Sequence, residues 1–209
     1  MSAVRASLAP PKVICEHVHA HGATVTHVRG MLIASARENL REIGVFDRYA
    51  QLLPSGMRDA VLYALASSWL PVEVALAHYH TCEQLDLTPD QITRLGELSA
   101  NRMIDTFFGR ALKVAREMGA ESYWALLEQN ARVYDRMYQG GGVTVLQTGP
   151  KDMYLENIGQ PLATCRFWRL LYLAYMEAIG RAFAKASYVK LVRPRAASPH
   201  AIAISGSWV

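Results

Sequence analysis

The feature that most constrains the fold of this chain is a change of hydrophobic period close to residue 143. Between residues 30 and 138, apolar side chains recur every three or four positions, as in amphipathic helices. From residue 143 onward, short β-branched and alternating runs stand on both sides of one aromatic-rich helical segment. We therefore predict an α+β fold, with a helical N-terminal part followed by a β-β-α-β-β antiparallel sheet unit.

The C-terminal unit consists of two predicted hairpins around a helix. Residues 143–148 and 153–158 form the first hairpin, because the Gly-Pro-Lys-Asp sequence between them is typical of a turn. Residues 188–193 and 201–208 form the second hairpin. The helix between the two hairpins covers residues 163–186. Alternation in the last strand predicts a sheet with one buried face and one face of small and polar residues.

The clearest single helix begins with a capping box. Thr88 and Gln91 flank Pro89 at the spacing that satisfies the free amides of a first helical turn, and Gly119 suits the helix end. Apolar residues cover much of the girth of this helix, residues 89–118, so we expect it to run through the centre of the protein. Further helices are predicted at residues 30–43, 46–52, 55–67, 72–85 and 122–138.

The N-terminal end is predicted to add a flexible arm and a short strand region. Residues 1–11 contain two prolines and few bulky groups, which favours an arm, and residues 12–209 are expected to form a single α+β domain. A chain of this length can bury about 70% of the surface that its unfolded form exposes. Residues 12–28 alternate and are rich in Val, Thr and His, which predicts one or two short strands around a turn at His21-Gly22.

Cysteine usage and hydropathy indicate a cytoplasmic protein. Cys15, Cys82 and Cys165 are odd in number and far apart, a pattern that favours free thiols in a reducing compartment. The amino terminus lacks the apolar core of a signal peptide, and no apolar run approaches the roughly 20 residues that cross a bilayer. We therefore expect no membrane span.

The net charge of +4 is concentrated at the carboxyl end. Five basic residues and no acidic residue follow Glu177. This patch is a candidate surface for phosphate or an acidic partner, whereas the simpler interpretation is an edge strand protected from strand addition by Lys and Arg. No recognition motif accompanies the charge, so nucleic-acid binding is not predicted.

Aromatic and basic side chains form the predicted ligand site. We expect a pocket between the helix at 89–118, the helix at 122–138 and the two hairpins, suited to a small apolar or anionic ligand. Arg132, Arg136 and Lys151 lie near the glycines at 140–142 and form a candidate anion-binding corner. The same aromatic spacing is also typical of a packed core. The predicted ligand-binding residues are Trp69, Phe107, Trp124, Tyr134, Arg136, Tyr138, Trp168 and Tyr172.

Two groups of histidine and cysteine are candidate metal sites. Cys15, His17, His19 and His21 alternate, so a strand would project all four from one face, although stretched over about 20 Å. The alternative interpretation is an exposed polar stretch. His78 and Cys82 are four residues apart on a predicted helix and could share a face, as part of a metal site, as a thiolate with its base, or as ordinary packing residues.

No catalytic motif is present. The glycines at 140–142 lead from a helix into a strand, the reverse of a phosphate-binding loop, so they are expected to end the helix and allow close backbone approach. The sequence contains no G-x-S-x-G, H-E-x-x-H or C-x-x-C. We therefore predict a protein that is not an enzyme.

Over residues 30–208, the order of elements resembles three groups of proteins that share a topology: the haem nitric-oxide/oxygen-binding domains, the 4-vinyl reductase sensor domains and the transport-particle subunits. The stretch from Leu95 to Gly119, with Thr106 and Gly109-Arg110-Ala111-Leu112, also resembles part of an uncharacterised bacterial family of similar length. The resemblance implies a cavity between helices and sheet for a small or lipophilic ligand, coupled to a partner protein or a homodimer.

The resemblance does not extend to the residues that hold haem. Haem-binding members carry a proximal histidine on a helix ahead of the first hairpin and a Tyr-x-Ser-x-Arg run that grips the propionates. Here Tyr138 is followed by Gln139 and three glycines, and residues 88–138 contain no histidine. Only His78 or His80, one helix earlier, could replace the proximal ligand. Haem is therefore not favoured, and the cofactor is left open.

The leading hypothesis is a non-catalytic small-molecule-sensing or protein-interaction domain with an apolar pocket. The alternatives are a metal- or haem-binding protein and a ligand-free homodimeric scaffold whose surplus apolar surface is an interface.

Overall fold

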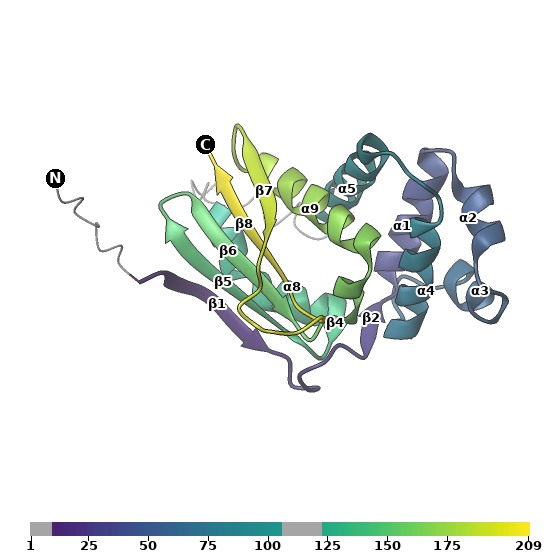
Figure 1. Ribbon diagram of the computed structural model, residues 1–209, viewed down its shortest axis with the longest axis horizontal. Helices are drawn as coiled ribbons and strands as arrows, with labels where there is room; N and C mark the ends of the chain where they lie inside the picture. The colour runs from purple at the N-terminus through teal and green to yellow at the C-terminus, as the bar shows by residue number, and fades with distance from the viewer. Residues whose placement is uncertain (1–9, 106–122) are drawn as a thin grey trace.

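A five-stranded antiparallel sheet forms one side of the protein in the computed structural model, which describes residues 10–105 and 123–209 (Figure 1). The strands lie in the order β1 (Lys12–Val18), β5 (Gly142–Gly149), β6 (Asp152–Ile158), β8 (Ile202–Trp208) and β7 (Ser187–Val192). The predicted α+β class and C-terminal β-β-α-β-β unit are confirmed. The predicted N-terminal strand pairs with β5 and so becomes one edge of this sheet.

One face of the sheet packs against helices. Val145, Leu155 and Ile204 pair across three neighbouring strands, and each is at most 1% exposed. Helix α9 (Arg166–Arg181) packs against β7 and β8, while α7 (Tyr123–Glu128) and α8 (Asn130–Met137) pack against the β1 end. The burial of this face therefore follows the alternation of the strands.

The opposite face is partly covered by the loop between β7 and β8. The amide of Ala196 donates to Oε1 of Glu156 at 2.8 Å, and the amide of Arg195 donates to the Tyr154 hydroxyl at 3.0 Å. Glu156 is consequently only 5% exposed. The expected face of small and polar residues is therefore less open than the sequence pattern suggested.

The helical part contains five helices among the described residues of the first half of the chain. They are α1 (Met31–Glu42), α2 (Phe46–Leu52), α3 (Ser55–Leu62), α4 (Val72–Glu83) and α5 (Pro89–Met103). The predicted capping box of α5 is present in full, with the Thr88 side chain accepting from Gln91 N–H and the Gln91 side chain accepting from Thr88 N–H. Buried residues of these helices belong to the same apolar cluster as those of the sheet.

A second, three-stranded sheet joins the helical part to the glycine segment. Its strands lie in the order β3 (Trp69–Pro71), β2 (His27–Arg29) and β4 (Tyr138–Gln139). The prediction of a helix over residues 55–67 was wrong at its end, because α3 ends at Leu62 and the chain then extends into β3. The helix ends here because the Arg37 guanidinium, rather than helical amides, donates to the carbonyl oxygens of Val61, Leu62 and Ala64.

Two other predicted boundaries also change, and a third is not tested. The single helix predicted at 122–138 is two helices that break at Gln129. The helix predicted at 163–186 is α9 preceded by a 3-10 turn, η2 (Pro161–Thr164). For the predicted helix at 89–118, residues beyond 105 lie outside the described part of the chain.

The glycines at 140–142 lie where the two sheets meet. Gly140 has φ +91° and Gly141 has φ +73°, values that favour glycine. A Cβ on Gly140 would lie 2.0 Å from the carbonyl oxygen of Thr24, so the prediction of a close backbone approach is confirmed. In the described part of the chain, no helix combines the length and apolar composition needed to span a lipid bilayer.

Candidate ligand-binding cavity

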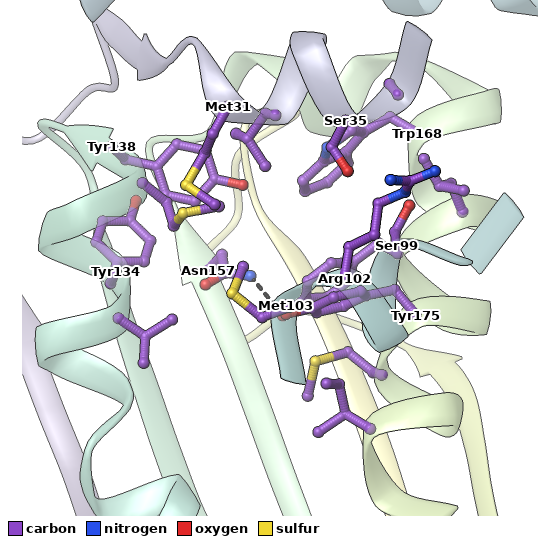
Figure 2. Close-up of a pocket in the computed structure, with 18 of the residues that line it drawn as sticks. Met31, Ser35, Ser99, Arg102, Met103, Tyr134, Tyr138, Asn157, Trp168 and Tyr175 are labelled. Carbon is purple, nitrogen blue, oxygen red and sulfur yellow. Dashed lines mark hydrogen bonds between the residues drawn. The ribbon is translucent and has the colours of Figure 1, made fainter. Parts of the chain in front are cut away.

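A cavity of about 490 Å³ lies between the helical part and the sheet (Figure 2). Helix α1 contributes Met31 and Ser35, α5 contributes Met103, α8 contributes Tyr134, and α9 contributes Trp168. The volume is in the range of small-molecule sites, roughly 300–1,000 Å³. The cavity overlaps the predicted position, because α5, α7 and α8 line it, but α1 and α9 supply further walls and, among the described residues, the two hairpins contribute only Asn157.

The lining is mainly apolar and aromatic. Four thioethers of the described residues reach it, and thioethers adapt to irregular ligands because the unbranched side chain is flexible and polarizable. Trp168 and Tyr172 stack one turn apart on α9, with ring centroids 5.2 Å apart and planes 9° apart. The methionines are Met31, Met103, Met137 and Met176, and the other aromatic lining residues are Tyr79, Tyr123, Tyr134, Tyr138 and Tyr175.

A few polar groups interrupt this apolar lining. Asn157 on β6 donates from Nδ2 to the Tyr172 hydroxyl at 2.9 Å, a contact that Figure 2 shows as a dashed line. Ser99 and Arg102 of α5 also belong to the lining. Arg102 donates from Nε to Oδ1 of Asn39 at 2.7 Å and lies 3.6 Å from the Glu42 carboxylate, so its charge is already compensated by the protein.

The tyrosines of the lining are uncharged phenols. Burial is the main cause that raises the pKa of Tyr123, Tyr134 and Tyr172 above the ordinary value of 10.0. The buried hydroxyl of Tyr123 has no hydrogen-bond partner within the described ranges 10–105 and 123–209. A buried hydroxyl without a partner is costly, so this group is a candidate contact for a polar atom of a ligand.

The structure brings together half of the predicted ligand-binding residues. Tyr134, Tyr138, Trp168 and Tyr172 line the cavity. Phe107 lies outside the described residues.

The other three predicted residues lie elsewhere. The guanidinium carbon of Arg29 lies over the Trp69 ring, 4.1 Å from the ring centroid. Trp124 donates to the carbonyl oxygen of Pro150 and packs on Trp208. Arg136 borders a smaller neighbouring hollow together with Arg29.

Several lining residues were missed by the sequence analysis, although a signal was present. The residues of α9 that face the cavity recur at spacings of three and four and define one helix face: Trp168, Leu171, Tyr172, Tyr175, Met176 and Ile179. Such a stripe is expected on any core-facing helix, so its spacing alone could not separate a cavity wall from a packed core.

His78 does not reach the cavity. Its ring is 1% exposed, with Nδ1 2.5 Å from the Tyr49 hydroxyl and Nε2 3.9 Å from Sγ of Cys82. Burial, with a smaller effect from Arg37, lowers the pKa of His78 to about 3. The ring is therefore neutral and hydrogen-bonded, and burial also raises the pKa of the Cys82 thiol, which does not favour a thiolate.

The N-terminal histidines contact helix α8. Nε2 of His17 lies 2.6 Å from Oδ1 of Asp135, and Nε2 of His19 lies 3.5 Å from the same oxygen. Cys15 is buried, and the ring of His21 stacks near that of His19. Only Cys15 and His17 lie within β1, because the strand ends at Val18 and His21 stands in the turn that follows, so the prediction that one strand carries all four was wrong. The side chain that joins His17 and His19 is a carboxylate from another element.

A helical part, a cavity and an antiparallel sheet in this arrangement define the fold of the haem nitric-oxide-binding (H-NOX) domains. The chain is similar to the Fe(II) unliganded H-NOX protein from K. algicida, with a TM-score of 0.57 and 9% identity over 87% of this chain and 96% of that chain. It is also similar to an oxygen-binding H-NOX domain related to soluble guanylate cyclases, with a TM-score of 0.55 and 9% identity over 86% and 94% of the two chains.

A third similar structure is a haem protein whose redox potential is modulated through porphyrin distortion. Its TM-score is 0.56 and its identity 10%, over 86% of this chain and 94% of that chain. No protein-family model matches the sequence, and no curated protein matches it either. The fold-level resemblance stated from the sequence is thus confirmed for the H-NOX domains, and these low identities establish the fold alone.

The side chains around the cavity do not fit a histidine-ligated haem. All seven histidines lie in the described ranges, and none lines the cavity. The buried His78, on the helix that could have supplied a substitute ligand, is engaged with Tyr49 and Cys82. The described lining offers phenols, thioethers and a few other polar side chains, so the H-NOX-like fold is present without a histidine in its cavity.

Proposed function

We propose that this protein is a non-catalytic sensor domain that binds a small, largely apolar molecule in the cavity between α1, α5, α8 and α9. The observation that carries the proposal is the lining itself. Four thioethers and a stacked Trp168–Tyr172 pair surround about 490 Å³, and only a few polar groups accompany them. A binding site of this chemistry favours a lipophilic ligand with one or two polar atoms.

The polar groups of the lining indicate how such a ligand would be oriented. The Tyr123 hydroxyl, which has no partner among the described residues, offers one hydrogen bond, and the Asn157–Tyr172 pair offers a second polar position on another wall. The rest of the surface would contribute apolar contact. Binding would bridge the helical part and the sheet, because both supply lining residues, and a change in their packing is the signal that a partner protein would detect.

The test is a thermal-shift and native mass-spectrometry screen of the full-length protein with fatty acids, isoprenoids and small aromatic metabolites. A specific ligand at 100 times its Kd raises the free energy of unfolding by about 2.7 kcal/mol. For a protein of this size that corresponds to a shift of about 5–10 °C. Val133→Phe on α8 fills part of the lining and should abolish the shift, whereas Val18→Phe, on an exposed position of β1, should preserve it.

Two outcomes would overturn the proposal. One is the absence of any shift across the panel together with no co-purified ligand. The other is a saturable Soret band on titration with haemin at one equivalent that Val133→Phe removes, since this would favour the haem alternative. The titration belongs to the test because the similar structures include an oxygen-binding H-NOX domain and a haem protein with a distorted porphyrin.

The homodimeric scaffold is tested separately by light scattering at micromolar concentration. The large apolar side chains that are exposed among the described residues are scattered: Val13 and Val18 lie on β1, Tyr63 and Leu65 precede β3, Tyr188 and Leu191 lie on β7, and Val209 follows β8. A dimer that forms without ligand and buries these residues would favour the scaffold over the sensor.

A further inference from the structure

Three metal-binding side chains meet where α4 contacts the start of α9, outside the cavity. His80 and Glu83 stand three residues apart on α4, and Cys165 is the N-cap residue of α9. One donor atom from each, a ring nitrogen, a carboxylate oxygen and a sulfur, lies within 4.8 Å of the other two. The His80 Nδ1 to Glu83 Oε2 distance is 3.0 Å.

These separations suit a borderline divalent ion. With bonds of about 2.0–2.3 Å, neighbouring ligand atoms of a tetrahedral zinc site are roughly 3.3–3.7 Å apart. The histidine and carboxylate atoms are already close to that distance, and the sulfur needs only a small side-chain movement. Imidazole, carboxylate and thiolate together are a donor set that Zn²⁺ accepts.

The fold holds two of the ligands in position. Oε1 of Glu83 accepts the amide of Phe167 at 3.0 Å, which leaves Oε2 directed at His80. The backbone of Cys165 is fixed as the amide donates to Leu162 and the carbonyl accepts from Arg169. The side chain of His80 is 50% exposed, so the ion has a route from solvent. A positioned carboxylate and thiol beside an accessible imidazole lower the cost of assembling the site.

We propose that His80, Glu83 and Cys165 bind a Zn²⁺-like ion with three protein ligands and one position open to solvent or to an external ligand. The ion would cross-link α4 to α9. Tyr79, next to His80, and Trp168, three residues after Cys165, both line the cavity, so the bound ion would stiffen two of its walls. The proposal does not depend on which ligand the cavity takes.

The experiment is a Co²⁺ titration of chelator-treated, full-length protein, followed by competition with Zn²⁺. We expect one equivalent of Co²⁺ to produce a thiolate-to-metal charge-transfer band that Zn²⁺ removes. Cys165→Ser should lose the band, and His80→Gln should weaken binding at least tenfold. The matched controls, Cys15→Ser in β1 and His200→Gln in the β7–β8 loop, should keep both band and affinity.

Three results would overturn the proposal. They are the absence of one-equivalent binding in the parent protein, a band that persists in Cys165→Ser, and a band that is lost in Cys15→Ser. If Cys165→Ser does not fold, His80→Gln decides, because this exposed side chain can be changed without disturbing the core. Unchanged affinity in His80→Gln would then contradict the site.

Discussion

The Tyr49 hydroxyl lies 2.5 Å from Nδ1 of His78, and neither residue is more than 1% exposed. The raised pKa of the phenol and the lowered pKa of the imidazole, both caused mainly by burial, make Tyr49 the donor and neutral His78 the acceptor. The pair joins α2 to α4 in the interior of the helical part. It gives this region a stability that depends on pH.

The first prediction is a loss of stability in acid that depends on His78. The pKa of this ring is about 3 when folded and 6.5 in the reference state, so the unfolded chain binds one more proton between these values. Stability is therefore complete above pH 6.5 and falls as the pH is lowered toward 3. Between pH 6.5 and 4.5 the loss should be about 2–3 kcal/mol. Urea unfolding at these two pH values measures it.

His78→Gln is the control for this pH dependence. Glutamine does not titrate, so the part of the slope that comes from His78 should disappear even if the variant is less stable at every pH. An unchanged slope in His78→Gln would show that the dependence arises from other groups.

The second prediction concerns the same substitution at two tyrosines with opposite results. Tyr49→Phe removes the donor to His78 and leaves a buried nitrogen unpaired, at a cost of about 1–3 kcal/mol. Tyr123→Phe removes a buried hydroxyl that has no partner in the described ranges, so stability should rise or change by less than about 0.5 kcal/mol. Urea unfolding compares the two. A cavity ligand that binds Tyr123→Phe as tightly as the parent would exclude this hydroxyl as its contact.

The third prediction concerns the crossing of α5 and α9. A Cβ at Gly96 would lie 2.4 Å from Cβ of Ala174 and 2.8 Å from the α9 backbone, so Gly96→Ala should force the helices apart. Overpacking of this kind costs about 1–3 kcal/mol. Gly56→Ala in α3 meets nothing within 4 Å and should be neutral or slightly stabilising. Equal melting temperatures for the two variants would contradict the close approach.

The fourth prediction concerns the end of α3. The Arg37 guanidinium donates to the carbonyl oxygens of Val61, Leu62 and Ala64, which no helical amide satisfies. Arg37→Met should lower the free energy of unfolding by about 2–3 kcal/mol, because the three carbonyl oxygens lose their charged hydrogen-bond donor. Arg48→Met, at a side chain that is 60% exposed, should cost less than about 0.5 kcal/mol. Urea unfolding measures both, and a similar cost at the two positions would argue against the capping role.

Local sequence signals predicted those elements whose formation depends on neighbouring residues. The capping box at Thr88 and the turn between β5 and β6 were found because their hydrogen bonds involve side chains and amides a few positions apart. The sheet of β2, β3 and β4 was missed because residues 28, 70 and 138 meet only in the folded chain. No local pattern at Trp69 specifies a strand that long-range pairing creates.

The sequence by itself determined the α+β class, the order of the C-terminal unit and the absence of a histidine from residues 88–138. Only the tertiary structure decided which of the aromatic residues face a cavity, since Trp124 and Trp168 have the same helical context but different neighbours. It also brought Cys165 beside His80 and Glu83, although Cys165 follows Glu83 by 82 residues in the sequence. The spacing of apolar residues shows which face of a helix or strand is apolar. Whether the apolar faces of distant segments pack tightly or enclose a cavity is decided only by the tertiary structure.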